Sequence, residues 1–386
     1  MKNIYSFLLF ALISFCAFSV YSAEQQKITK IWLTFGSNTA DRITVNWISN
    51  EPGDSVVQYG PSDQYGKTVR TDEKVRLHHV EIPLDQRGAA WHYCVSTGKE
   101  RSDDAVFTSL PTEELRVAVF GDWHCAGDIS AIVKDKVHFI MSAGDNIPSL
   151  RQFGGEGNRE TTKGYEYLIG NYPDLFRSIP FMPVLGNHDR EIRDRGKRYP
   201  PLPSYDPDAY AFCQFFRLPD PGWRWSLDIP EFPVRFIALD LNHVYDFGTT
   251  WQTCHPFDAD SDQYRWYRDQ MKDAEGRFTI TVQNERSSSV RDLCKGIWGK
   301  EMKKSTICVS GFGYFAERAE HEGGTWYNIS LHGKGARYPD PYSQFFQSRD
   351  SYLLITLKRA EGTLSAEIKD LDGICIDRKV FSLKKK

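Results

Sequence analysis

Three short polar segments of this chain carry residue types that bind metal ions. In chain order they are Gly121-Asp122-Trp123-His124, Gly144-Asp145-Asn146 and Gly186-Asn187-His188-Asp189, and an apolar run precedes each one. In an α/β protein, ligands collect at the carboxyl ends of strands. Carboxylate, imidazole and amide oxygen groups are donors that suit Zn, Mn or Fe. The three segments therefore predict a transition-metal site, and metal-assisted hydrolysis is chemistry that such a site can perform.

The elements that must position these segments follow from the pattern after residue 115. Apolar runs at 117–120, 137–141 and 181–185 read as strands, and helices are predicted at 128–136, 160–178 and 261–274. Strands rich in β-branched residues close the chain. Alternating strands and helices followed by a strand-rich end predict an α/β domain at 115–386, in which two mixed sheets pack face to face between helices, as αββα layers. Residues 190–230, rich in Pro and aromatic residues, are predicted to form a long surface insertion over the site.

The N-terminal third has a different pattern. Short alternating runs at 31–35, 43–47, 55–59, 79–82 and 91–95 are separated by Gly, Pro, Asn and Asp. Strands at this spacing are typical of a β-sandwich, and residues 27–110 are predicted to form a fibronectin-III-like one. Residues 111–114 then read as a linker between the two domains.

The first 23 residues have the pattern of a cleavable signal sequence. Lys2 precedes an apolar core at 7–20, and small residues follow it. This core is shorter than the roughly 20 residues that a membrane span needs. We therefore expect a secreted or periplasmic protein without a membrane span. Secretion permits disulfides, and Cys213 with Cys254 or Cys294 with Cys308 are possible pairs.

The order and context of the polar segments resemble the calcineurin-like metallophosphoesterase superfamily, and within it the purple acid phosphatases. The resemblance covers most of residues 27–340 and also supports the N-terminal sandwich. It implies that Asp122 and His124 bind one metal ion, that Asp145 bridges two, and that Asn187 binds the second. It also implies that His188 contacts the phosphate or the leaving group, with Asp189 available to fix the tautomer of His188.

Two later segments depart from the family pattern. That pattern has a strand ending in His and then Gly-His-x-His-x-Tyr-Glu-Arg, where this chain has Asn284, Phe312 and Tyr314 in place of the three histidines. The second metal position would keep only Asp145 and Asn187, too few protein ligands for tight binding. We therefore expect at most one tightly bound Fe, Zn or Mn ion. Glu285 and His332 are candidate replacements for a lost ligand.

Two functions remain open at this stage. One is hydrolysis of a phosphate ester at a divergent metal site. The alternative is a catalytically silent relative that binds a phosphorylated ligand, a glycan or a protein partner in the same cleft. Nucleic acid is not an expected partner, because the net charge is −3 and no basic run precedes Lys384-Lys385-Lys386.

Overall fold

The structure is a computed structural model that describes residues 27–196, 203–219, 221–244, 253–332, 335 and 338–383. The predicted signal sequence at 1–23 and the lysines at 384–386 lie outside the described residues. Parts of the predicted insertion, at 197–202 and 220, lie outside them as well. None of the described helices combines the length and the apolar character that crossing a membrane would require.

The N-terminal module is built from strands whose alternating apolar residues are buried. Six strands pair antiparallel, and the long strand β2 contacts β1, β3 and β4. The strands are β1 (Ile31–Thr34), β2 (Arg42–Gly60), β3 (Lys67–Pro83), β4 (Ala90–Thr97), β5 (Glu100–Arg101) and β6 (Ala105–Thr108). The runs at 43–47 and 55–59, predicted as two strands, are one strand here. Its pairing with β3 shifts register between Ile48 and Ser55, which accounts for the polar interruption in the sequence.

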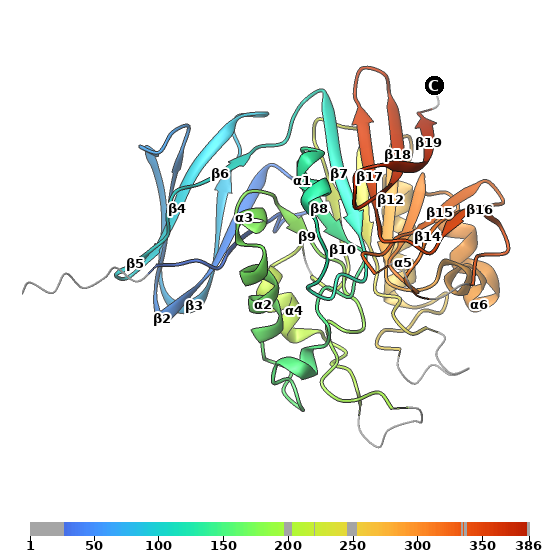
Figure 1. Cartoon of the computed structure of the whole chain (residues 1–386), viewed down its shortest axis with the longest axis horizontal. Helices are drawn as coiled ribbons and strands as arrows, with labels where there is room; N and C mark the ends of the chain where they lie inside the picture. Colours follow the sequence, from blue (N-terminus) through green and yellow to red (C-terminus); the bar gives the residue numbers. More distant parts are fainter. Residues whose placement is uncertain are drawn as a thin grey trace, which may run out of the picture.

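Two mixed sheets form the rest of the molecule (Figure 1). The first has the order β19-β18-β17-β7-β8-β9, with β7, β8 and β9 parallel. Its strands are β7 (Glu114–Phe120), β8 (Phe139–Ser142), β9 (Phe181–Met182), β17 (Ser351–Lys358), β18 (Thr363–Asp370) and β19 (Cys375–Ser382). The central strands are buried on both faces, as expected for a sheet inside a layered core.

The second sheet has the order β10-β11-β12-β13-β15-β14-β16, with β11, β12, β13 and β15 parallel. Its strands are β10 (Trp225–Asp228), β11 (Val234–Ala238), β12 (Phe278–Gln283), β13 (Ile307–Ser310), β14 (Ala316–His321), β15 (Gly324–Asn328) and β16 (Ser343–Gln347). Helices α5 (Asp262–Asp273) and α6 (Ser287–Met302) cover its outer face through a cluster that includes Tyr267 and Trp298. Together with α1 (Ser130–Lys134) beside the first sheet, they give the predicted α/β core of αββα layers.

Three helices follow the loop after β8 or precede β10, and one of them, α3, contacts β1 of the N-terminal module. They are α2 (Lys163–Asn171), α3 (Pro173–Phe176) and α4 (Tyr210–Phe216), and a 3₁₀ turn at Leu150–Phe153 precedes them. The prediction of one helix over 160–178 is wrong: the helix breaks at Tyr172, because Pro173 lacks an N–H and disfavours helix in the residue before it.

The predicted surface insertion at 190–230 is also corrected by the structure. Its helix α4 buries Phe212, Phe215 and Phe216, and the ring of Phe215 stacks on Trp32 of β1 with centroids 4.2 Å apart. One hydrophobic cluster therefore runs from the N-terminal sandwich into the first sheet. The two cysteine pairs considered above are not formed, since no disulfide joins any cysteines of the described residues.

Candidate metal centre

Strand ends from both sheets converge on the predicted site. Loops after β7, β8 and β9 carry the three intact polar segments. Loops after β12 and β13 carry the segments in which histidines are replaced, and the loop after β15 carries His332. The loops contact each other directly: Leu331 donates its N–H to Gly121 O at 2.9 Å, and Asn284 Nδ2 donates to Ala143 O at 2.8 Å. The site is thus a seam between the two sheets.

Two glycines allow this close approach. A Cβ on Gly121 would lie 2.4 Å from the Cα of Gly311 in the opposite sheet, and a Cβ on Gly186 would lie 2.1 Å from the backbone nitrogen of Asp145. Atoms of a folded protein do not sit that close without a bond between them. These glycines therefore belong to the packing of the site rather than only to its turns.

The backbone of the site is strained. Asp122, His124, Asp145 and Tyr314 all have positive φ, between 46° and 62°. For a residue with a side chain this left-handed region costs energy, and such residues cluster at binding sites where the surrounding structure holds them in place. Four residues with positive φ at one site indicate that the loops are held in conformations that direct these side chains toward the site.

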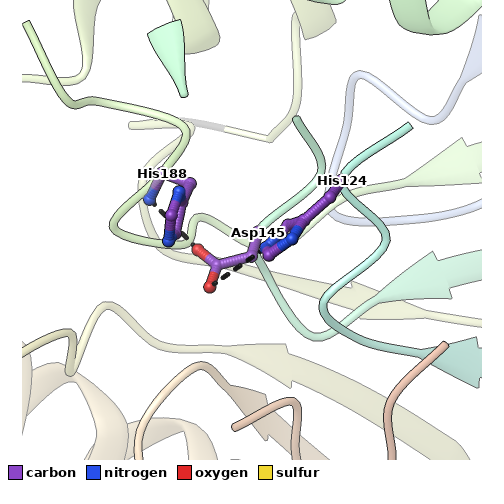
Figure 2. Close-up of side chains that lie close together, drawn as sticks. All are labelled: His124, Asp145 and His188. Carbon is purple, nitrogen blue, oxygen red and sulfur yellow. Dashed lines mark hydrogen bonds and ion pairs between the residues drawn. The ribbon is translucent and has the colours of Figure 1, made fainter. Parts of the chain in front are cut away.

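Figure 2 shows the Asp145 carboxylate between the imidazoles of His124 and His188. One ligand atom from each of these three residues lies within 4.8 Å of the others. His124 Nε2 is 3.9 Å from Asp145 Oδ2, and the His188 backbone N–H donates to Asp145 Oδ1 at 3.1 Å. The group therefore contains two of the four predicted metal ligands and the imidazole that was predicted to contact phosphate.

The other two predicted ligands lie beside this group. Burial and the charge of Asp145 raise the pKa of Asp122 well above its ordinary value, although hydrogen bonding from Ser330 opposes the shift. Asp122 Oδ2, His124 Nε2 and Asn187 Nδ2 are buried and have no hydrogen-bond partner within the described residues. Buried polar atoms without partners are rare, because each costs about 1–3 kcal/mol.

His188 is oriented by a backbone carbonyl. Its Nδ1 contacts Pro148 O, and because a carbonyl only accepts, Nδ1 carries the proton and Nε2 is left for a ligand. Burial lowers the pKa of His188, but the charges of Asp145 and Glu191 outweigh burial and raise this pKa above its ordinary value. For Asp145, burial raises the pKa, yet His188 and His124 hold it below its usual range.

The expectation that Asp189 fixes the tautomer of His188 is wrong. The Asp189 carboxylate accepts from the N–H of Gly186 at 2.8 Å and from Asn146 Nδ2 at 2.8 Å, so it ties the second and third polar segments together. Burial, with the charge of Asp145, raises the pKa of Asp189 to about 7. Pro148 takes the predicted role, and a backbone carbonyl leaves no signal in a sequence.

The three replaced histidine positions have distinct surroundings. Asn284 donates Nδ2 to Ala143 O and Gly311 O, at 2.8 and 2.5 Å, which leaves its buried Oδ1 without a partner. Phe312 is half-buried, and its N–H donates to Asn328 Oδ1 at 3.2 Å. The ring of Tyr314 stands edge-on to His124 with centroids 6.0 Å apart. Burial and the charges of Asp122 and Asp145 raise the pKa of Tyr314, so its hydroxyl keeps its proton.

The two candidate replacements differ in position. Glu285 Oε1 accepts the N–H of Arg286 at 2.7 Å, beside the start of α6. His332 lines a cavity of about 460 Å³ together with His124, Tyr314, Gly335 and Asp350. This placement follows from the pairing of β13 with β15, a long-range contact without a local sequence signal.

The donor set fits a transition-metal ion. Asp122 Oδ2 and His124 Nε2 are buried atoms that lack partners, and they offer the carboxylate oxygen and imidazole nitrogen that Zn, Mn and Fe accept. Asp145 is held ionised beside them. Positions 284 and 312 carry an amide and a phenyl ring, and the expectation that the second metal position binds weakly stays a prediction.

Residues 115–305 match the sequence model of the calcineurin-like phosphoesterase family. In the comparison with curated proteins, none matches the chain. Among solved structures, a purple acid phosphatase from seeds of yellow lupin (Lupinus luteus) superposes with a TM-score of 0.69 at 15% identity, covering 92% of this chain and 74% of the lupin chain. PhoD superposes with a TM-score of 0.59 at 12% identity, covering 92% of this chain and 88% of that one. At these identities the likeness shows the fold.

Proposed function

Because residues 115–305 are a calcineurin-like phosphoesterase domain, we propose that this protein is a secreted phosphoesterase that hydrolyses phosphate esters with one resident transition-metal ion. The ion would be Fe, Zn or Mn, held by Asp122, His124 and Asp145. The substrate would be a small phosphate ester, as in the acid-phosphatase-like relatives.

One observation carries this proposal. Asp122 Oδ2 and His124 Nε2 are buried without partners on backbone of positive φ, beside the Asp145 carboxylate. A protein that bound no ligand here would have a higher unfolding free energy if these atoms had partners and the backbone had ordinary φ angles. Together they are what a site prepared for a cation requires.

The side chains have separate tasks in such a reaction. An ion held by Asp122, His124 and Asp145 would lower the pKa of a coordinated water and would draw charge from the phosphoryl oxygens. Pro148 O holds the Nδ1–H of His188, and the charges of Asp145 and Glu191 favour the protonated ring, so that Nε2–H can donate to the phosphoryl group or the departing oxygen. Tyr314 keeps its proton and lines the cavity, so its hydroxyl can donate to a phosphate oxygen.

The test combines metal content with phosphate release. The natively purified protein is analysed by elemental mass spectrometry and assayed with a generic aryl phosphate, before and after chelation. We expect up to one equivalent of metal and weak turnover that disappears in Asp145→Ala. Turnover that survives both chelation and Asp145→Ala would exclude this site as its source.

A specific observation favours a second candidate, a silent ligand-binding relative. Asn284, at a lost ligand position, bridges Ala143 O and Gly311 O and thereby holds the two sheets together. At this position the chain has a side chain that stabilises the contact between the two sheets, where the family pattern has a metal ligand. Metal and inorganic phosphate binding in calorimetry, with phosphate release that is no faster than in Asp145→Ala, would support the silent function.

Secretion is a separate part of the proposal. The charged start, the apolar core at 7–20 and the small residues before residue 24 support it. Expression of the full chain in a secreting host, followed by N-terminal sequencing of the exported protein, tests it. We expect cleavage near residue 23, and retention of the uncleaved chain inside the cell would contradict secretion.

A further inference from the structure

His332 is fixed to the loop that carries Asp122 and His124. The preceding residue Leu331 donates its N–H to Gly121 O at 2.9 Å, and His332 Nε2 lies 3.2 Å from Trp123 O. The side chain of Trp123 is fully buried among aromatic rings, so its carbonyl is a rigid acceptor. The imidazole of His332 is therefore held by the same loop that presents two of the predicted metal ligands.

This contact determines which ring nitrogen is available. Trp123 O only accepts, so His332 Nε2 carries the proton in the contact and the neutral ring keeps its lone pair on Nδ1. Histidines that bind metals commonly donate the other ring N–H to a carbonyl or a carboxylate, which fixes the tautomer. His332 has this arrangement, on the wall of the cavity that His124 also lines.

The distance between the rings of His124 and His332 agrees with both imidazoles binding one ion. The centroids of His124 and His332 are 5.4 Å apart, and the ring planes differ by 33°. Two imidazoles on one tetrahedral ion have centroids roughly 5 Å apart, given metal–nitrogen bonds of about 2 Å. Tyr314 lies on the same cavity, so the position that has lost its histidine and His332 face the same space.

We propose that His332 is the fourth ligand of the ion held by Asp122, His124 and Asp145, and that it takes the place of the imidazole missing at position 314. The proposal rests on the metal site of the proposed function. With His332 the ion has four protein ligands, two carboxylates and two imidazoles. Glu285 is not the replacement, because its carboxylate lies at the start of α6, with Oε1 bonded to the N–H of Arg286.

Ligation requires a rearrangement of the side chains. The three residues whose ligand atoms lie within 4.8 Å of one another are His124, Asp145 and His188, and both Asp122 and His332 are outside this group. Its Nδ1 would have to move toward His124 Nε2 as the ion binds, by rotation about the side-chain bonds. Since His124 Nε2 has no hydrogen-bond partner within the described residues, this movement breaks no bond on that side.

The experiment measures metal affinity in the absence of substrate. The mature chain is stripped of metal, and Zn²⁺ is titrated in competition with a chromophoric chelator. Co²⁺ is used in parallel, because its visible absorption reports the number and geometry of ligands. The variants are His332→Ala, the double variant His332→Ala with Tyr314→His, and His321→Ala as a control, a histidine that stacks on Tyr342 away from the site.

We expect His332→Ala to weaken Zn²⁺ binding at least about 100-fold and to weaken the Co²⁺ absorption. His321→Ala should leave both unchanged. The double variant should recover most of the affinity, which also shows that the single variant had not simply unfolded. An unchanged affinity in His332→Ala, or a loss that Tyr314→His does not repair, would overturn the proposal while the metal site stands. A wild-type chain that binds neither ion would overturn the proposed function itself.

Discussion

At the scale of single residues, the candidate site contains groups that oppose folding. Asp122 is buried beside the ionised Asp145, and burial with this charge raises the pKa of Asp122 well above its ordinary value. A buried carboxyl with a raised pKa destabilises the metal-free protein at neutral pH, and a cation bound at Asp122 would relieve this cost. Stability and metal binding should therefore respond to mutation in opposite directions.

Asp122→Asn tests this opposition. The amide keeps the shape of the side chain and removes the charge, so we expect the metal-free protein to gain about 1 kcal/mol of unfolding free energy. The Kd for Zn²⁺ should rise at least about 10-fold, because a carboxylate ligand is lost. Urea unfolding in the presence of a chelator gives the first quantity and titration gives the second. Asp63→Asn, at an exposed residue, should change neither. A destabilised Asp122→Asn protein would contradict the argument.

Asn284 provides the converse case, a former ligand position that now stabilises the fold. Asn284→Ala leaves the carbonyls of Ala143 and Gly311 without this donor, and each unsatisfied buried group costs about 1–3 kcal/mol. We expect a loss of about 2–4 kcal/mol in urea unfolding. Asn171→Ala, at an exposed helix residue, is the control and should cost little. A neutral Asn284→Ala would show that solvent reaches these carbonyls.

At the scale of elements, the seam depends on strand ends approaching each other without side chains. Gly121→Ala places a Cβ 2.4 Å from the Cα of Gly311, a backbone atom that can move only if the sheets separate. We expect a cost of about 1–3 kcal/mol and weaker metal binding, because the loops that carry Asp122 and Asn284 would shift. Gly170→Ala in α2 is the matched control. Its nearest atom is 4.0 Å away, and alanine favours helix, so stability should rise by up to about 1 kcal/mol.

The elements also show what the sequence can predict. The apolar runs before Asp122, Asp145 and Asn187 predicted strands with polar ends, because burial and chain direction are local properties of these segments. The core position of α4 was missed, because its aromatic residues pack against Trp32 and Phe181, which are distant in the sequence. The placement of His332 likewise depends on strand pairing, and that of His188 on a backbone carbonyl. Sequence patterns give residue types and strand ends, whereas long-range packing decides which of them meet.

At the scale of the whole molecule, the N-terminal sandwich and the αββα core share one hydrophobic cluster, so a loss of stability in one part should affect the other. One buried and one half-buried histidine, His78 and His79, give a way to test this coupling. His78 stacks on Trp47 and lies 2.9 Å from Ser49 Oγ and 2.8 Å from Ser55 Oγ. Burial lowers the pKa of His78 to about 4, and burial with the charge of Arg217 lowers that of His79 to about 4.

The sign of the pH dependence follows from these lowered pKa values. Between pH 6.5 and 4 the unfolded chain binds protons at both imidazoles, whereas the folded protein keeps them neutral. The stabilisation is therefore complete above about pH 6.5 and is lost as the pH falls toward 4, by up to about 1.4 kcal/mol per pH unit for each histidine.

Unfolding followed by fluorescence across this range should show a single transition that moves to lower urea as the solution is acidified. His78→Gln should reduce the slope of unfolding free energy against pH, whatever its effect at pH 7. If the sandwich unfolded at acidic pH while the metal site kept its affinity, the two parts would be energetically separate, and the shared cluster would not couple them.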